Sequence, residues 1–323
     1  MNIKTILVFV TVILLSGCTA DTADTNSIST ANDGIDVKLL DNSFSDIYYE
    51  GDPFNIEVQI ENIGDYTIPE YDDSVDEGTR GFYLTLTGFN PTSFGLTDAM
   101  DLRKLSFSGL DSIFDTNNDS IIVGTDIISY RDLCYVNDLT DPYNLNVKFY
   151  SCYPYQTVVK SKVCFGEHRS DLNEVCTVNE AKEFTNSRAP VQATSLSEVY
   201  VGNDEYRFMI DFKNLGSGNI IDSQFIPTCT SLSSTSLSSM SIVSIKLDGE
   251  ELINDERLEL ELPNDKDKVR ITNNEASVYF KIKDLESNDY VSDLQVVLNY
   301  GYKKSFEEST IIYDVEGVSG CDL

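Results

Sequence analysis

The sequence has no tryptophan, a single histidine and few basic residues for a chain of 323 residues. Its 23 Lys and Arg residues stand against 54 Asp and Glu residues, which gives a formal net charge of −31. Proteins that bind nucleic acid release counterions from phosphates with Lys and Arg, so this balance argues against nucleic acid as a partner. It argues equally against attachment to anionic lipid through a polybasic surface.

The shortage of imidazole argues against an enzyme. His168 is the one side chain that could serve as a neutral-pH base in a Ser-His-Asp or Cys-His site, and its sequence neighbours are all polar. Neither a GxSxG elbow nor a GxGxxG or GxxxxGK[ST] nucleotide motif occurs. We therefore predict no catalytic residues and no nucleotide cofactor.

One short hydrophobic run, Ile6 to Leu15, follows Lys4 near the start of the chain. A bilayer span needs about 20 apolar residues, so this run is too short to cross and is typical of a signal peptide. The segment Leu15-Ser-Gly-Cys18 comes next and resembles the lipobox of prokaryotic lipoproteins. The resemblance implies that residues 1–17 are a signal peptide removed before Cys18, and that the Cys18 thiol carries a diacylglycerol.

Residues 18–34 are predicted to be an acidic tether between the lipid and the folded body. They contain Asp21, Asp24 and Asp33 but no aromatic residue. So little apolar surface does not offset the entropy lost on ordering the chain. The mature protein is thus expected to be exported, held at the membrane by the lipid on Cys18, and located at the cell surface or in the envelope.

Seven cysteines are present, and lipidation of Cys18 leaves an even number. In an exported chain an even number favours disulfides. We expect Cys229 to pair with Cys321 and the other four to pair among themselves, with Cys164 joined to Cys176 across a polar loop. Zinc is not favoured, because no CxxC or HxxxH spacing occurs. The six disulfide candidates are Cys134, Cys152, Cys164, Cys176, Cys229 and Cys321.

The remaining chain has the pattern of β-strands. Phe54 to Ile60 alternates apolar and polar residues with the period of a half-buried strand, whereas helical periodicity is confined to Leu172 to Phe184. The predicted fold class is therefore all-β. Further predicted strands are 83–87, 145–150, 157–165, 206–212, 278–282, 294–300 and 310–315.

A weak internal repeat suggests two copies of one module. Residues 54–68 align without gaps on residues 206–220, and each copy ends its strand in Asn-x-Gly, at Asn62 and at Asn214. We expect each Asn and Gly to supply the positive φ angles of a turn. A chance similarity between two alternating strands is the alternative.

This pattern resembles the immunoglobulin-like modules of prokaryotic surface proteins, most closely the cell-adhesion-related domain of bacteria (CARDB). The resemblance implies two immunoglobulin-like β-sandwich domains. We place them at residues 35–187 and 188–323, because polar residues and a proline interrupt the strand pattern at 185–190.

One segment has the spacing of a calcium loop. Asp115, Asn117, Asp119 and Asp126 stand at positions 1, 3, 5 and 12 of such a loop, and oxygen ligands are what calcium prefers. Ser120 replaces the glycine expected at position 6, and Asp126 replaces the usual glutamate. The alternative is an Asn/Asp-rich turn between two strands. Calcium is the one cofactor that the sequence suggests.

The expected function is non-catalytic: adhesion, binding of a surface or envelope partner, or structural spacing by a lipid-anchored protein. Two alternatives stay open. A lipid-anchored solute-capture protein would have a deep pocket between its domains. An envelope hydrolase would place two carboxylates in a cleft.

Overall fold

The computed structural model describes most of the chain after Asp33, and the predicted signal peptide, Cys18, most of the tether and His168 lie outside the described residues. Strands dominate, so the all-β prediction is confirmed; the described part of residues 172–184 forms no helix. No helix in the described part is long and apolar enough to cross a membrane. The described ranges are 33–41, 43–70, 81–96, 102–106, 110–115, 120–166, 176–231, 238–262, 268–285, 289–318 and 320–321.

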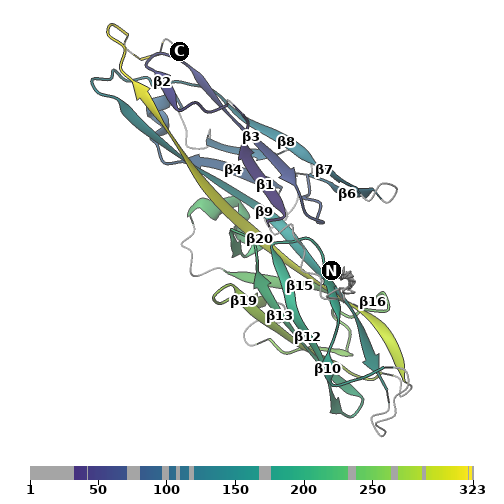
Figure 1. Cartoon of the computed structure of the whole chain (residues 1–323). Coiled ribbons are helices and arrows are strands. Elements are labelled where there is room, and N and C mark those ends of the chain that lie inside the picture. The colour runs from purple at the N-terminus through teal and green to yellow at the C-terminus, as the bar shows by residue number, and fades with distance from the viewer. Residues whose placement is uncertain are drawn as a thin grey trace, which may run out of the picture.

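Two long antiparallel strands form the axis of the molecule. β9 (Tyr143–Phe165) and β20 (Tyr290–Tyr313) pair without a break from Tyr143↔Ile312 to Phe165↔Tyr290. In Figure 1 they run side by side along the whole length of the body. They lie at the centre of a ten-stranded sheet of order β16-β15-β20-β9-β4-β5. Its other strands are β16 (Glu250–Glu251), β15 (Ser239–Leu247), β4 (Phe82–Thr87), β5 (Arg103–Ser106), β11 (Phe184–Asn186), β14 (Asn219–Ile221), β18 (Lys268–Arg270) and β2 (Ile47–Tyr49).

Two smaller sheets cover this large sheet, one over each half of its length (Figure 1). The three-stranded sheet has the order β1-β3-β8, and the five-stranded sheet has the order β10-β12-β13-β19-β17. A separate hairpin joins β6 (Ser112–Asp115) to β7 (Ser120–Val123). The strands of the two smaller sheets are β1 (Ile35–Leu39), β3 (Phe54–Asn62), β8 (Thr125–Leu133), β10 (Glu180–Ala181), β12 (Val191–Gly202), β13 (Glu205–Asn214), β19 (Glu275–Ile282) and β17 (Leu258–Leu260).

Alternation of side chains decides which face of each strand is buried. In β9, Val159 and Val163 are buried against the smaller sheets, whereas Lys160 and Lys162 are exposed on the opposite side. We call the covered side of the large sheet its inner face and the other side its outer face. Apolar side chains of the inner face and of the smaller sheets form one continuous core.

The internal repeat extends over a whole five-stranded module. β1, β3 and β8 are neighbours in one small sheet, as β12, β13 and β19 are in the other. β4 pairs with β9, and β15 pairs with β20 in the same antiparallel sense. We call β1, β3, β4, β8 and β9 the first module, and β12, β13, β15, β19 and β20 the second module.

The two modules exchange the ends of their last strands, so the division at 187/188 does not separate two bodies in space. The later half of β9 lies in the second module, where Phe165 packs edge-on against Tyr206. The later half of β20 lies in the first module, where Phe306 stacks on Phe149. A boundary drawn along the sequence cuts through the shared sheet, because both strands are longer than one sandwich.

Candidate functional site

Four tyrosines mark the point where the modules exchange strands, which we call the waist. Tyr153 lies opposite Tyr302, and Tyr155 lies opposite Tyr300, all on the inner face and fully buried. The ring centroids of Tyr153 and Tyr302 are 5.7 Å apart, and those of Tyr155 and Tyr300 are 6.4 Å apart. These rings fill the space between the two smaller sheets.

The tyrosine hydroxyls are hydrogen-bonded rather than free for chemistry. Tyr153 donates to the Asp33 carbonyl at 2.7 Å, and the Gly218 amide donates to the Tyr302 hydroxyl at 2.8 Å. Burial raises the pKa of all four hydroxyls. They are therefore protonated at neutral pH and serve to hold the waist together.

The Asn-x-Gly turn of the first module ends at the waist. Asn62 is buried, and its amide group donates to the carbonyls of Tyr66 and Leu110, each at 2.7 Å. Its side-chain oxygen accepts a bond from the Gly64 amide at 3.1 Å. A Cβ atom on Gly64 would lie 1.7 Å from the Tyr155 hydroxyl, so only glycine fits there.

The second module repeats these bonds. The Asn214 amide group donates to the Gly218 carbonyl at 2.8 Å, and its oxygen accepts from the Gly216 amide at 3.2 Å and from the Tyr302 hydroxyl at 3.2 Å. Neither asparagine nor either glycine of the two motifs has a positive φ angle, so that expectation was wrong. The asparagine side chain closes each turn instead.

The first described residue is also fastened at the waist. The Asp33 carboxylate accepts bonds from the Ser217 amide at 2.7 Å and from the Lys304 ammonium at 2.8 Å. Burial opposes ionisation of this carboxyl, but the bonds from Lys304 and Ser217 outweigh it and hold the pKa of Asp33 below its usual value. Asp33 and Gly34, which were predicted to lie in the tether, thus belong to the body.

All six predicted cysteines form disulfides, but the pairing of Cys229 with Cys321, and with it the pairing of the other four among themselves, was wrong. Cys229 pairs with Cys152, not with Cys321, because it lies in the 3₁₀ segment η4 (Ser223–Ser231) that covers the outer face at the waist. Cys321 pairs with Cys134, because β20 carries the following chain to the tip of the first module. The predicted pair Cys164–Cys176 is confirmed. Three disulfides indicate an oxidising compartment.

The described residues include only part of the predicted calcium loop. Asn117 and Asp119 lie outside the described residues. Asp115 is at the loop end of the β6–β7 hairpin, whereas Asp126 follows β7 beyond the other end of that hairpin and accepts a bond from the Ile127 amide at 2.8 Å. A run of β-branched residues, Ile121 to Val123, favours a strand over a loop here. The described residues hold no group of three His, Cys, Asp or Glu side chains suited to a metal ion.

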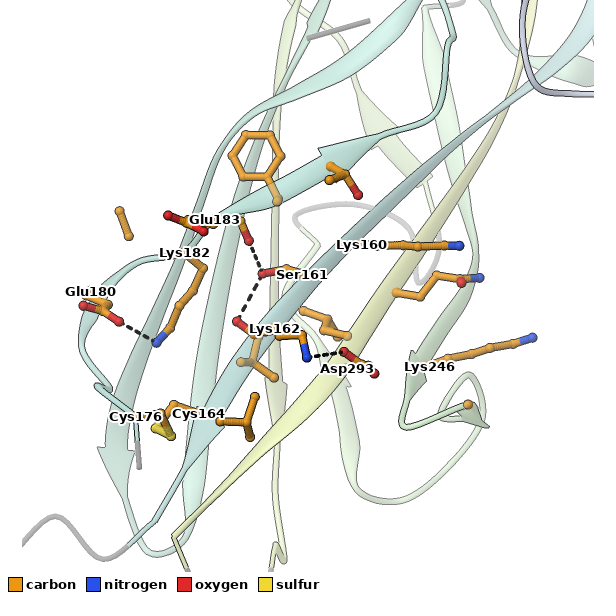
Figure 2. Close-up of a pocket in the computed structure, with 18 residues that line it drawn as sticks. Lys160, Ser161, Lys162, Cys164, Cys176, Glu180, Lys182, Glu183, Lys246 and Asp293 are labelled. Carbon is orange, nitrogen blue, oxygen red and sulfur yellow. Dashed lines mark hydrogen bonds and ion pairs between the residues drawn. A yellow bond between two sulfur atoms is a disulfide. The ribbon is translucent and has the colours of Figure 1, made fainter. Parts of the chain in front are cut away.

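A groove of about 940 Å³ crosses the outer face of the second module (Figure 2). Lys160 and Lys162 of β9 and Lys246 of β15 line it, together with Asp293 and Gln295 of β20. The Lys162 ammonium lies 3.9 Å from an Asp293 carboxylate oxygen, and both side chains are largely exposed. The groove lies on one module rather than between the two, unlike the pocket expected of the solute-capture alternative.

A buried ion pair supports one wall of the groove. Lys182 lies 3.0 Å from Glu198, and the main-chain amide of Cys164 donates to both oxygens of that carboxylate. Burial raises the pKa of Glu198, while the Cys164 amide and Lys182 act in the opposite direction. With the Cys164–Cys176 disulfide, this pair fixes the segment before β11 against β9 and β12.

Comparison with known proteins gives no relative to argue from. No family model matches the chain, and no curated protein matches it.

The groove was not predicted from the sequence, although Lys160-Ser-Lys162 within a predicted strand places both ammonium groups on one face. The third lysine, Lys246, is close only after the sheet has formed.

Proposed function

We propose that this protein is an exported, lipid-anchored, non-catalytic binding protein that displays two immunoglobulin-like modules at the cell surface or in the envelope. The observation that carries the proposal is the place where the chain enters the body. Asp33 is held at the waist, midway along β9 and β20, rather than at either tip. The three disulfides support an exported location, and the CARDB resemblance supports an adhesive role.

Attachment of the tether at the middle of the body favours a role in binding over a role as a structural spacer. Asp33 lies fifteen positions after Cys18, and that length of chain spans at most about 50 Å when fully extended. The paired strands β9 and β20 are about 75 Å long. A stalk would be attached at one end of that length and would hold that tip at the membrane, whereas a body attached at its waist leaves both tips equally far from the anchor.

The lipid anchor is tested with Cys18→Ala and with Thr19→Ala as a matched control. Cells are fed radioactive palmitate, and the membrane and soluble fractions are probed for the protein. The native chain and the control should be labelled and membrane-bound, and Cys18→Ala should be unlabelled and released. Labelling of Cys18→Ala, or an unlabelled native chain, would contradict the proposal.

Side-on attachment is tested by protease protection on intact cells. Cleavage sites engineered at the two tips, in the turn Asn203–Asp204 and after Tyr313, should be cut at similar rates, since both tips are equally far from the waist. A stalk standing on one tip would protect that tip far more than the other.

A further inference from the structure

The two modules differ most at one pair of equivalent rows of side chains on the outer face. In the second module, Lys246 lies opposite Gln295, and Gln295 lies opposite Lys160, in register across β15, β20 and β9. Thr185 of β11 continues this row beyond Lys160. Figure 2 shows the Lys160 and Lys246 side chains extending in the same direction from the sheet.

The first module has the same row with a different charge pattern. Thr87, Lys148 and Glu307 occupy the equivalent places on β4, β9 and β20. The Lys148 ammonium lies 2.5 Å from the Glu307 carboxylate, so this row neutralises itself. In the second module neither Lys160 nor Lys246 forms an ion pair with a described carboxylate. Glu251 of β16 lies opposite Lys246, but its carboxylate accepts bonds from the Ser244 hydroxyl and the Ile245 amide.

We propose that the groove of the second module binds an acidic polysaccharide, with Lys160 and Lys246 holding its carboxylates. This inference deepens the proposed function and rests on it for the display of the groove at the surface. The two lysines stand two strands apart, a spacing of about 10 Å. A polymer that repeats its carboxylate can offer one acid to each ammonium group, and Gln295 and Thr185 can bond to its hydroxyls.

The floor of the groove favours a glycan over a peptide. On the floor of the groove β20 lies between β15 and β9, and β11 pairs with β9 at residues 159–161, so the main-chain groups of these central strands already bond within the sheet. A buried peptide would leave its own main-chain groups unpaired there. Phe184, the one aromatic residue of the lining, is 3% exposed and presents no ring to a neutral sugar. Charge is therefore the main means of recognition.

The groove also faces away from the attachment of the tether. Asp33 bonds to Tyr153 on the inner face of the large sheet, whereas Lys160 and Lys246 extend from the outer face. A body held through Asp33 can thus turn its groove away from the membrane.

The test measures binding of the full-length protein, purified in a non-ionic detergent, to immobilised polygalacturonate, with dextran as the neutral polymer. The double variant Lys160→Gln/Lys246→Gln removes the two charges, and Lys148→Gln is the matched control in the equivalent row. We expect binding to polygalacturonate and not to dextran. The double variant should bind about tenfold more weakly or worse, the control should stay within about twofold, and added salt should weaken binding.

Absence of binding to polygalacturonate, or equal losses in the double variant and the control, would overturn the proposal. Binding to poly-L-glutamate without binding to polygalacturonate would also overturn it and would identify an acidic peptide as the ligand. Binding to dextran would refute recognition by charge. All these results are obtained away from the membrane, so a failure of lipid anchoring at Cys18 is seen separately in the palmitate experiment.

Discussion

The two modules are alike at the waist and different at their outer faces. Tyr153 and Tyr155 of β9 correspond to Tyr300 and Tyr302 of β20, each pair being 147 positions apart in the sequence. Asn62 and Asn214 make the same bonds to their turns. The outer rows of the same strands carry an ion-paired lysine in one module and, in the other, two lysines that form no ion pair among the described residues.

The waist and the outer faces place different requirements on their side chains. The waist is buried, and its polar groups need matched partners, so both copies use the same residue types. The outer faces meet solvent, and their residues can change with little cost to folding. The residues that the two modules share therefore form the structural framework, and the residues at which the modules differ form the candidate binding surface.

The largest expected effect comes from ending the chain at Gly301. This removes the half of β20 that completes the first module and leaves the half that completes the second. We expect β3 and β8 to lose their protection from amide hydrogen exchange, while β13 and β19 keep theirs. A chain ended at Glu316 retains β20 and is the control; protection of β3 in the shorter chain would contradict the strand exchange.

The contribution of each disulfide to the free energy of unfolding should increase with the length of chain that it closes. Cys134–Cys321 spans 187 positions and Cys164–Cys176 spans 12. Replacing both cysteines by serine should lower the free energy of unfolding by about 5 kcal/mol for the first and about 3 kcal/mol for the second, because the longer loop restricts the unfolded chain more. Urea unfolding without reductant measures both values, and the reverse order would contradict this account.

Asn62 and Asn214 should contribute equally to stability if the two turns are as similar as their hydrogen bonds indicate. Asn62→Ala and Asn214→Ala should each cost about 2–3 kcal/mol, since each leaves buried main-chain groups without a partner. Chemical unfolding measures both, and exposed Asn146→Ala should change stability by less than about 0.5 kcal/mol. A loss at one site only would show that the two turns are not equivalent.

The smallest effect concerns the pH dependence of the waist. The pKa of Asp33 is held below the ordinary 3.8, so its ionised form stabilises the folded state above that pH, and this contribution is lost as pH falls toward the lowered value. Asp33→Asn should therefore lower stability by about 1 kcal/mol near neutral pH and by less in acid. Thermal unfolding from about pH 7 to about pH 3 measures the difference; a constant difference would mean that ionisation of Asp33 is not involved.

Local patterns in the sequence predicted β3, β4, β13, β19 and parts of β9 and β20, but they missed β8, β12 and β15 and did not show where strands join. Leu145–Tyr150 and Thr157–Phe165 were expected as separate strands and are parts of β9. Pro154 and Gly301 lie inside these continuous strands at the waist, opposite each other. The equal spacing of the two Tyr-x-Tyr pairs was the available signal for this continuity.

The cysteine pairing and the groove could not be predicted for a related reason. Both depend on strands that cross from one module into the other: β20 brings Cys321 to Cys134, and β9 places Lys160 beside Gln295 in the second module. Alternation along one strand shows which residues share a face. Alternation does not show which other strand lies next to that strand in the sheet.

The exchanged strands also set an order of events during synthesis. A chain that emerges from the ribosome N-terminus first presents β1, β3 and β8 long before the half of β20 that completes their sandwich. Cys134 likewise waits for Cys321 before their disulfide can close. The first module therefore stays open until the last strand arrives, and the protein matures as a single unit rather than one domain after another.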